Sequence, residues 1–131
     1  QLNQEVGDLS HAKLKGYTQI ETVGRIDNLE NKFYISILSG LPRIEFESVL
    51  SHELLHIWLY QNNIKLSPEK EEGFCNLGRY LIYQNNQTHF ATIHLQAMEN
   101  DPDPIYGIEY RKMKIKLEQI GWKNLILYLL N

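Results

Sequence analysis

The sequence has a single cysteine and no long apolar run, and these two absences exclude several classes of protein. Cys75 cannot form a disulfide within the chain, which favours a reducing compartment. The apolar stretch at residues 125–130 is too short to span a bilayer. No run of Lys or Arg indicates a nucleic-acid surface. We therefore expect a cytoplasmic protein with no membrane span and no nucleic-acid partner.

The rest of the composition is that of an ordinary globular protein. Hydrophobic residues make up 43% of the 131 residues, charged residues 22%, and the net charge is −3. This length suits one domain. Residues 1–16 are polar and weakly patterned, so we expect a linker or a poorly ordered N-terminus there, with the whole of 1–131 forming a single domain.

Strand patterns come first along the chain. Residues 17–26 alternate loosely and contain Thr, Ile and Val, and residues 32–38 alternate more strictly. Asp27, Asn28 and Asn31 supply turn chemistry between them. The two stretches are expected to pair as a hairpin.

Helical patterns follow. Ser67 and Pro68 fit the N-cap and first position of a helix, and Gly121 fits a helix end. The expected helices are 45–61, 68–83, part of 89–99 and 105–119, followed by a short terminal helix. Strands first and helices afterwards predict an α+β fold.

One string points directly to chemistry, the HELLH sequence at residues 52–56. A four-residue spacing places His52 and His56 on the same face of a helix, where both imidazoles can bind one ion. Glu53 can then act as general base towards a metal-bound water. The alternative is a structural histidine pair on a buried helix, which would need polar partners.

A catalytic zinc takes three protein ligands and leaves one position open. Glu69, Glu71 and Glu72 follow the loop after the motif helix. Simple compensation of the helix dipole explains Glu69. Helical phase favours Glu71, but a ligand that faces a cleft need not lie on the apolar stripe, so Glu72 stays open.

Several strings, in the same order and with similar spacing, resemble the C-terminal peptidase domain of the plant DA-one family. They are GLPR (40–43), SHELLHIWL (51–59), LSPEKEEGFC (66–75) and ENDPDPIYG (99–107). Members of that family are LIM-domain proteins that act as ubiquitin-activated peptidases. The string Glu72-Gly73-Phe74 also resembles the third-ligand segment of the gluzincins, which selects Glu72 over Glu71.

The resemblance implies a compact gluzincin-like domain, with a small sheet over the HExxH helix and one Zn²⁺ per chain. It implies Tyr106 as the donor that stabilises the oxyanion, although a packed aromatic is an equal interpretation. Asn76 lies where thermolysin-like enzymes carry an aspartate, and it is expected to orient His52. Tyr110, His89 and His94 are weaker candidates.

Three other features are given more modest interpretations. Cys75 is interpreted as a small buried hydrophobe. The string Ala97-Met98-Glu99-Asn100 is similar to an element of zinc aminopeptidases, but it follows HExxH instead of preceding it, so we treat it as coincidence. The strand 32–38 is expected to pair with an extended substrate.

Together these features predict a zinc-dependent peptidase, most simply an endopeptidase, that hydrolyses protein or peptide substrates. By resemblance, ubiquitin or another activating protein is an expected partner. The alternative function is a latent or non-catalytic zinc module that binds ubiquitin or an adaptor. The intact Glu53 favours the enzyme, because a purely structural zinc site has no use for a base.

Overall fold

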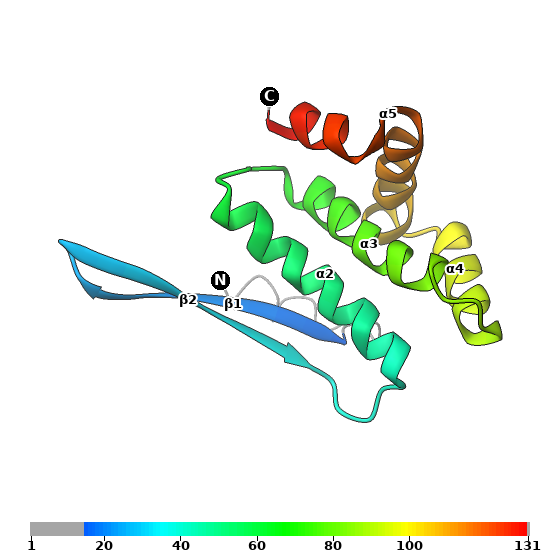
Figure 1. The fold of residues 1–131 in the computed structure, drawn as a ribbon, viewed down its shortest axis with the longest axis horizontal. Coiled ribbons are helices and arrows are strands. Elements are labelled where there is room, and N and C mark those ends of the chain that lie inside the picture. Colours follow the sequence, from blue (N-terminus) through cyan, green and yellow to red (C-terminus); the bar gives the residue numbers. More distant parts are fainter. Residues whose placement is uncertain (1–14, 131) are drawn as a thin grey trace.

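A computed structural model describes residues 15–130, so the expectation for residues 1–16 lies almost wholly outside the described residues. Two strands precede a series of helices (Figure 1). The elements are β1 (Gly16–Arg25), β2 (Asn28–Ile37), α2 (Arg43–Gln61), α3 (Pro68–Gln84), α4 (His89–Asn100), the π-helical turn η2 (Pro104–Glu109) and α5 (Tyr110–Leu130). This order confirms the α+β fold.

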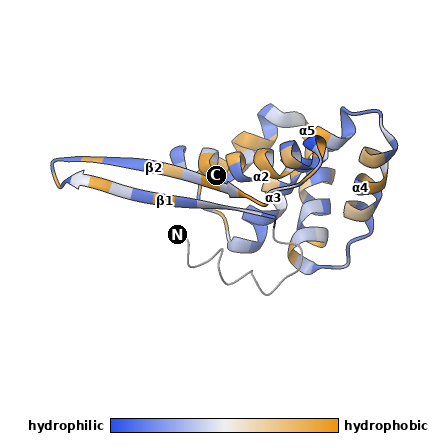
Figure 2. Cartoon of the chain, turned by 90° about the horizontal axis from the view of Figure 1, so that it is seen from below, coloured by the Kyte–Doolittle hydropathy of each residue, from blue (hydrophilic) through white to orange (hydrophobic). Residues whose placement is uncertain are grey.

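Strands β1 and β2 form a long antiparallel hairpin whose tip projects beyond the helices (Figures 1 and 2). The pairing runs from Gly16 with Ile37 to Arg25 with Asn28, so the turn has only two residues. The expectation that Asn31 belongs to the turn is therefore wrong. Asn31 lies inside β2, because the tight turn lets the strand begin four residues earlier than the alternation indicated.

Helices α2 and α3 lie side by side, and the hairpin lies along the other side of α2 (Figure 1). The expected start of α3 is confirmed, because the Ser67 hydroxyl accepts from the Lys70 amide and Pro68 takes the first helical position. The two helices approach closely at Gly78. A Cβ there would stand 3.0 Å from the Ser51 hydroxyl and 3.1 Å from the Leu55 side chain.

The apolar core lies mainly between α3 and α5, with the C-terminal end of α2 closing it. Phe74 lies at its centre, stacked on Trp58 and edge-on to Trp122. The fully or largely buried core residues are Leu59, Ile64, Phe74, Cys75, Leu77, Tyr80, Tyr110, Met113, Leu117, Leu125 and Leu129. Helix α3 therefore turns an apolar face to α5, which leaves its other face for polar contacts with α2.

The C-terminal part differs from the expected helix over 105–119. It begins as the π-helical turn η2, where the Asp103 carboxylate accepts from the amides of Ile105 and Tyr106. Helix α5 then continues past Gly121, whose φ of +79° breaks the helical geometry as expected. None of the described helices is both long and apolar enough to cross a bilayer.

We predict that Gly73→Ala destabilises the protein, although the same change in an exposed helix would stabilise it by about 1 kcal/mol. A Cβ on Gly73 would stand 2.7 Å from the backbone of Glu109, so α3 and η2 must separate. Urea unfolding should show a loss of about 1–3 kcal/mol. Gly78→Ala meets mainly side-chain atoms and should cost less, and a gain of stability for Gly73→Ala would contradict the described packing.

Candidate metal centre

The buried face of α2 carries polar side chains where an ordinary helix would carry apolar ones. His52, Glu53 and His56 are only 7%, 4% and 8% exposed. Buried titratable groups of this kind require partners, because burying an unpaired polar group costs free energy. Helix α3 supplies most of these partners.

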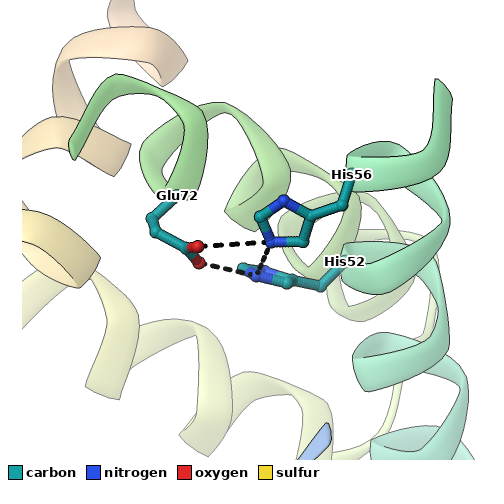
Figure 3. A group of neighbouring side chains, drawn as sticks. All are labelled: His52, His56 and Glu72. Carbon is teal, nitrogen blue, oxygen red and sulfur yellow. Dashed lines mark hydrogen bonds and ion pairs between the residues drawn. The ribbon is translucent and has the colours of Figure 1, made fainter. Parts of the chain in front are cut away.

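The two histidines and Glu72 meet at one point between α2 and α3 (Figure 3). The Nε2 atoms of His52 and His56 are 3.3 Å apart. Glu72 Oε1 lies 3.0 Å from Nε2 of His52, and Oε2 lies 3.3 Å from Nε2 of His56. The structure thus brings together the three residues that the sequence singled out as metal ligands.

Asn76 determines the tautomer of His52. The Asn76 amide nitrogen donates to the backbone carbonyl of Tyr106 at 3.0 Å, which turns its side-chain oxygen towards His52. That oxygen accepts from Nδ1 of His52 at 2.8 Å. With the hydrogen on Nδ1, Nε2 of the neutral ring presents a lone pair to the cluster.

Glu71 does the same for His56. Its Oε2 lies 2.6 Å from Nδ1 of His56, so the carboxylate accepts the Nδ1 hydrogen and leaves Nε2 with a lone pair. Glu71 and Glu72 therefore both contact the motif, on opposite sides of the His56 ring. Such outer hydrogen bonds fix the orientation of metal-binding histidines in proteins.

This donor set fits a zinc ion. Two neutral Nε2 atoms and a carboxylate present only lone pairs to one another, an arrangement that is unfavourable unless a cation stands between them. In a tetrahedral site with bonds of about 2.0–2.1 Å, ligand atoms stand about 3.3 Å apart. The observed separations of 3.0–3.3 Å match that spacing.

Electrostatics point in the same direction. Burial opposes the charge on both partners, but hydrogen bonds with the two histidines hold the pKa of Glu72 well below its ordinary range. Burial would lower the pKa of His56, yet its hydrogen bonds with Cys75, Glu71 and Glu72 raise that pKa well above the usual value. Both shifts favour a positive charge beside the Glu72 carboxylate, and a divalent cation would supply it.

Glu53 is held by the first strand. The Thr18 hydroxyl, from β1, donates to Oε1 of Glu53 at 2.8 Å. Gly16 also lies close, because a Cβ there would stand 2.6 Å from Val49 and 3.6 Å from Glu53. The contact to Glu53 thus comes from β1, and the pairing of strand 32–38 with an extended substrate stays a prediction.

Two hollows meet the cluster from different sides. The first, which we call the Arg79 cavity, has a volume of about 430 Å³ and is reached by His52, Glu53 and Glu72. The second, the hairpin groove, has a volume of about 1040 Å³, runs between the hairpin and the end of α2, and is reached by His56 and Glu71. A ligand at the cluster can therefore extend in two directions.

Among the remaining candidates, Tyr106 lines the Arg79 cavity. Tyr110 does not suit a role in the site, because it is fully buried and its hydroxyl donates to Glu99 at 2.7 Å. His94 lines the cavity, but its Nδ1 bonds the carbonyl of Phe90 at 2.9 Å.

Cys75 is fully buried, as expected for a small core residue. Burial raises the pKa of its thiol to about 12, so the thiol stays protonated at neutral pH. Ala97, Met98 and Asn100 line the cavity. The carboxylate of Glu99 contacts Tyr110 and Lys114 instead.

The roles of three residues in the site were not foreseen from the sequence. Thr18 gave no signal, because its contact with Glu53 joins residues 35 positions apart. Glu71 was weighed only as a metal ligand, and its bond to the outer nitrogen of His56 was not foreseen. Arg79 could have been found, since it lies seven residues after Glu72 and therefore on the same face of the helix.

Fold and site together define an α+β protein with a buried His₂Glu cluster suited to a divalent metal ion. A family model described as "DA1-like: Protein DA1" matches residues 16–94, well over half of the chain. The chain belongs to this DA1-like family. The matched region contains the hairpin, α2, α3 and all three residues of the cluster.

Curated relatives agree over shorter stretches. "Protein DA1-related 2" of Arabidopsis thaliana is 46% identical over 48 residues, which cover 36% of this chain and 9% of the relative. "LIM domain-containing protein HDR3" of Oryza sativa subsp. japonica is 47% identical over 51 residues, 36% of this chain and 10% of the relative. The matches thus span about a tenth of these relatives' length. No solved structure matches the chain.

We predict that Glu72→Ala abolishes stoichiometric zinc binding, because it removes one of the three groups that could hold the ion. Glu71→Ala should keep one zinc per chain but weaken its binding about 10- to 100-fold, because it removes only the hydrogen bond that orients His56. Elemental analysis gives the stoichiometry, and competition with a chromophoric chelator gives the affinity. The reverse order of effects would assign the ligand role to Glu71.

Asn76→Ala should also weaken zinc binding about 10- to 100-fold, because Nδ1 of His52 loses its acceptor. Asn76→Asp is the matched comparison, since a carboxylate accepts from Nδ1 but cannot donate to the Tyr106 carbonyl, so this variant should bind zinc more tightly than Asn76→Ala. The same chelator competition measures both variants. Equal affinity of wild type and Asn76→Ala would show that Asn76 does not position the imidazole.

Proposed function

We propose that this chain is a zinc-dependent peptidase of the gluzincin type, with His52, His56 and Glu72 as metal ligands. The observation that carries the proposal is the convergence of three lone-pair donors at the spacing of a tetrahedral zinc site. Three protein ligands, rather than four, leave a position for water. Membership of the DA1-like family is consistent with this function.

Glu53 is the proposed general base. A bound zinc would lower the pKa of its water towards neutrality and polarise the substrate carbonyl. Glu53 accepts a proton from the attacking water and passes it to the nitrogen of the leaving amine. The Thr18 hydroxyl occupies Oε1 of Glu53, which leaves Oε2 for the water and holds the carboxylate in one orientation.

Tyr106 is the proposed donor to the developing oxyanion. Its side chain lines the cavity that His52, Glu53 and Glu72 also reach. Its backbone carbonyl accepts a hydrogen bond from the Asn76 amide, and Asn76 in turn orients His52. This chain of contacts supports a fixed relation between the tyrosine and the metal, as stabilisation of a transition-state charge requires.

The proposed substrates are proteins or peptides cleaved at internal bonds. Hollows on both sides of the cluster offer room for substrate residues before and after the cleaved bond. We further propose that the chain is one catalytic domain, and that ubiquitin or another activating protein controls it, as the resemblance to the DA-one peptidases implies.

Glu53→Gln should retain zinc and lose at least about 100-fold in hydrolysis, because the amide cannot accept the proton of the water. Hydrolysis of a quenched fluorescent peptide library by the zinc-loaded chain measures the loss. Glu47→Gln is the control, because Glu47 is an exposed glutamate on the same helix that pairs with the exposed Arg43 side chain. Zinc binding with no hydrolysis by the wild type, with or without ubiquitin, would favour a non-catalytic binding module.

A further inference from the structure

Arg79 is a cationic side chain in the cavity beside the His₂Glu cluster, and one of its donor atoms has no acceptor. Its Nε is buried and has no hydrogen-bond partner within the described part of the chain. Across residues 15–130 it also takes part in no ion pair. Burying an N–H donor without an acceptor costs free energy. We therefore expect a ligand to supply an acceptor for the Nε hydrogen of Arg79.

The position of Arg79 ties it to the metal site. Glu72, Asn76 and Arg79 follow at spacings of four and three along α3, so they form one stripe, and all three line the Arg79 cavity. A rise of 1.5 Å per residue separates Glu72 and Arg79 by about 10 Å along the helix axis. An extended peptide covers that distance in about three residues.

The other acidic and basic groups that line this cavity have partners of their own, and Glu53 accepts from the Thr18 hydroxyl. Lys15 contacts Glu45, and Glu72 contacts both histidines. The Asp101 carboxylate accepts from the amide of Asp103 at 2.9 Å. Apolar side chains form much of the remaining wall, namely Val49, Tyr83, Ala97, Met98 and Pro102. A cation in such surroundings interacts more strongly with an anion than it would in open water.

We propose that Arg79 binds a carboxylate of the substrate, within about three residues of the cleaved bond, and so determines specificity. A guanidinium offers Nε–H and Nη–H side by side, which matches the two oxygens of a carboxylate. The carboxylate comes from an Asp or Glu side chain or from the substrate's C-terminus. The inference rests on the proposed peptidase function, because it assigns the substrate class of that same site.

Peptide hydroxamates test this without turnover, because the hydroxamate group binds the zinc directly. One series carries the hydroxamate at the N-terminal end of a tripeptide and the other at the C-terminal end. Each position holds Glu or Gln in turn, and the first series is made with a free and with an amidated C-terminus. Affinities are measured by calorimetry on the zinc-loaded chain.

We expect one Glu position, or the free C-terminus, to bind roughly 10- to 100-fold more tightly than its neutral counterpart. Arg79→Gln should remove that preference while keeping one zinc per chain. Arg79→Lys should retain part of it, since it keeps the charge but loses the planar pair of donors. Arg43→Gln, which removes an arginine whose side chain is 93% exposed, should leave the preference unchanged.

Two results would overturn the inference: equal affinity for every Glu and Gln pair and for both C-terminal forms, or a preference that survives in Arg79→Gln. If Arg79→Gln does not fold, the wild-type pairs and Arg79→Lys still decide. Failure of the proposed function itself looks different, because the zinc-loaded chain would then hydrolyse none of the peptide library, whatever its affinity for the hydroxamates.

Discussion

His52 and His56 each donate their Nδ1 hydrogen to an acceptor on α3, and the geometry of the site depends on these two bonds. They settle which ring nitrogen carries the hydrogen and turn both Nε2 lone pairs towards one point. Neither bond could form if the helices stood further apart. The glycine at position 78 permits the close approach of α2 and α3, since even a methyl group there would press on Ser51 and Leu55.

The same constraint explains where the apolar core lies. Around His52 and His56, the face of α2 that meets α3 is occupied by polar groups, so this stretch supplies few of the hydrophobic contacts that hold the domain together. Those contacts are made by α5 and by the C-terminal end of α2, where Phe74 packs between Trp58 of α2 and Trp122 of α5. Helix α3 thus serves two functions at once. Its core face fixes its position, and that fixed position presents Glu71, Glu72 and Asn76 to the histidines at distances that a loosely packed helix could not maintain.

Much of this arrangement could be predicted from local sequence, because local rules govern it. The spacing within HELLH fixes His52, Glu53 and His56 on one helix, and Ser67-Pro68 fixes where the next helix begins. The choice between Glu71 and Glu72 could not be settled by phase, for a physical reason. An imidazole has two nitrogens on different sides of its ring, so neighbouring carboxylates about 100° apart on α3 can each reach one of them. Phase indicates the side from which a residue approaches but not which nitrogen it meets. The contact between Thr18 and Glu53 could not be predicted from local sequence, because it depends on how a hairpin packs against a helix.

Asn76 shows why an amide occupies this position rather than a stronger acceptor. Its oxygen accepts from His52, and its nitrogen donates to the carbonyl of Tyr106 in η2. A carboxylate would strengthen the first bond but could not make the second, because an ionised carboxylate has no hydrogen to donate. The amide is the weaker acceptor for the histidine, but it connects the His₂Glu cluster directly to η2. Tyr106 lies in η2, and the Arg111 guanidinium donates to the carbonyls of Met98, Glu99 and Asp101 in the adjoining cavity wall. A displacement of this wall would therefore change the position of His52. Asn76 thus joins the cavity wall to the His₂Glu cluster through two hydrogen bonds.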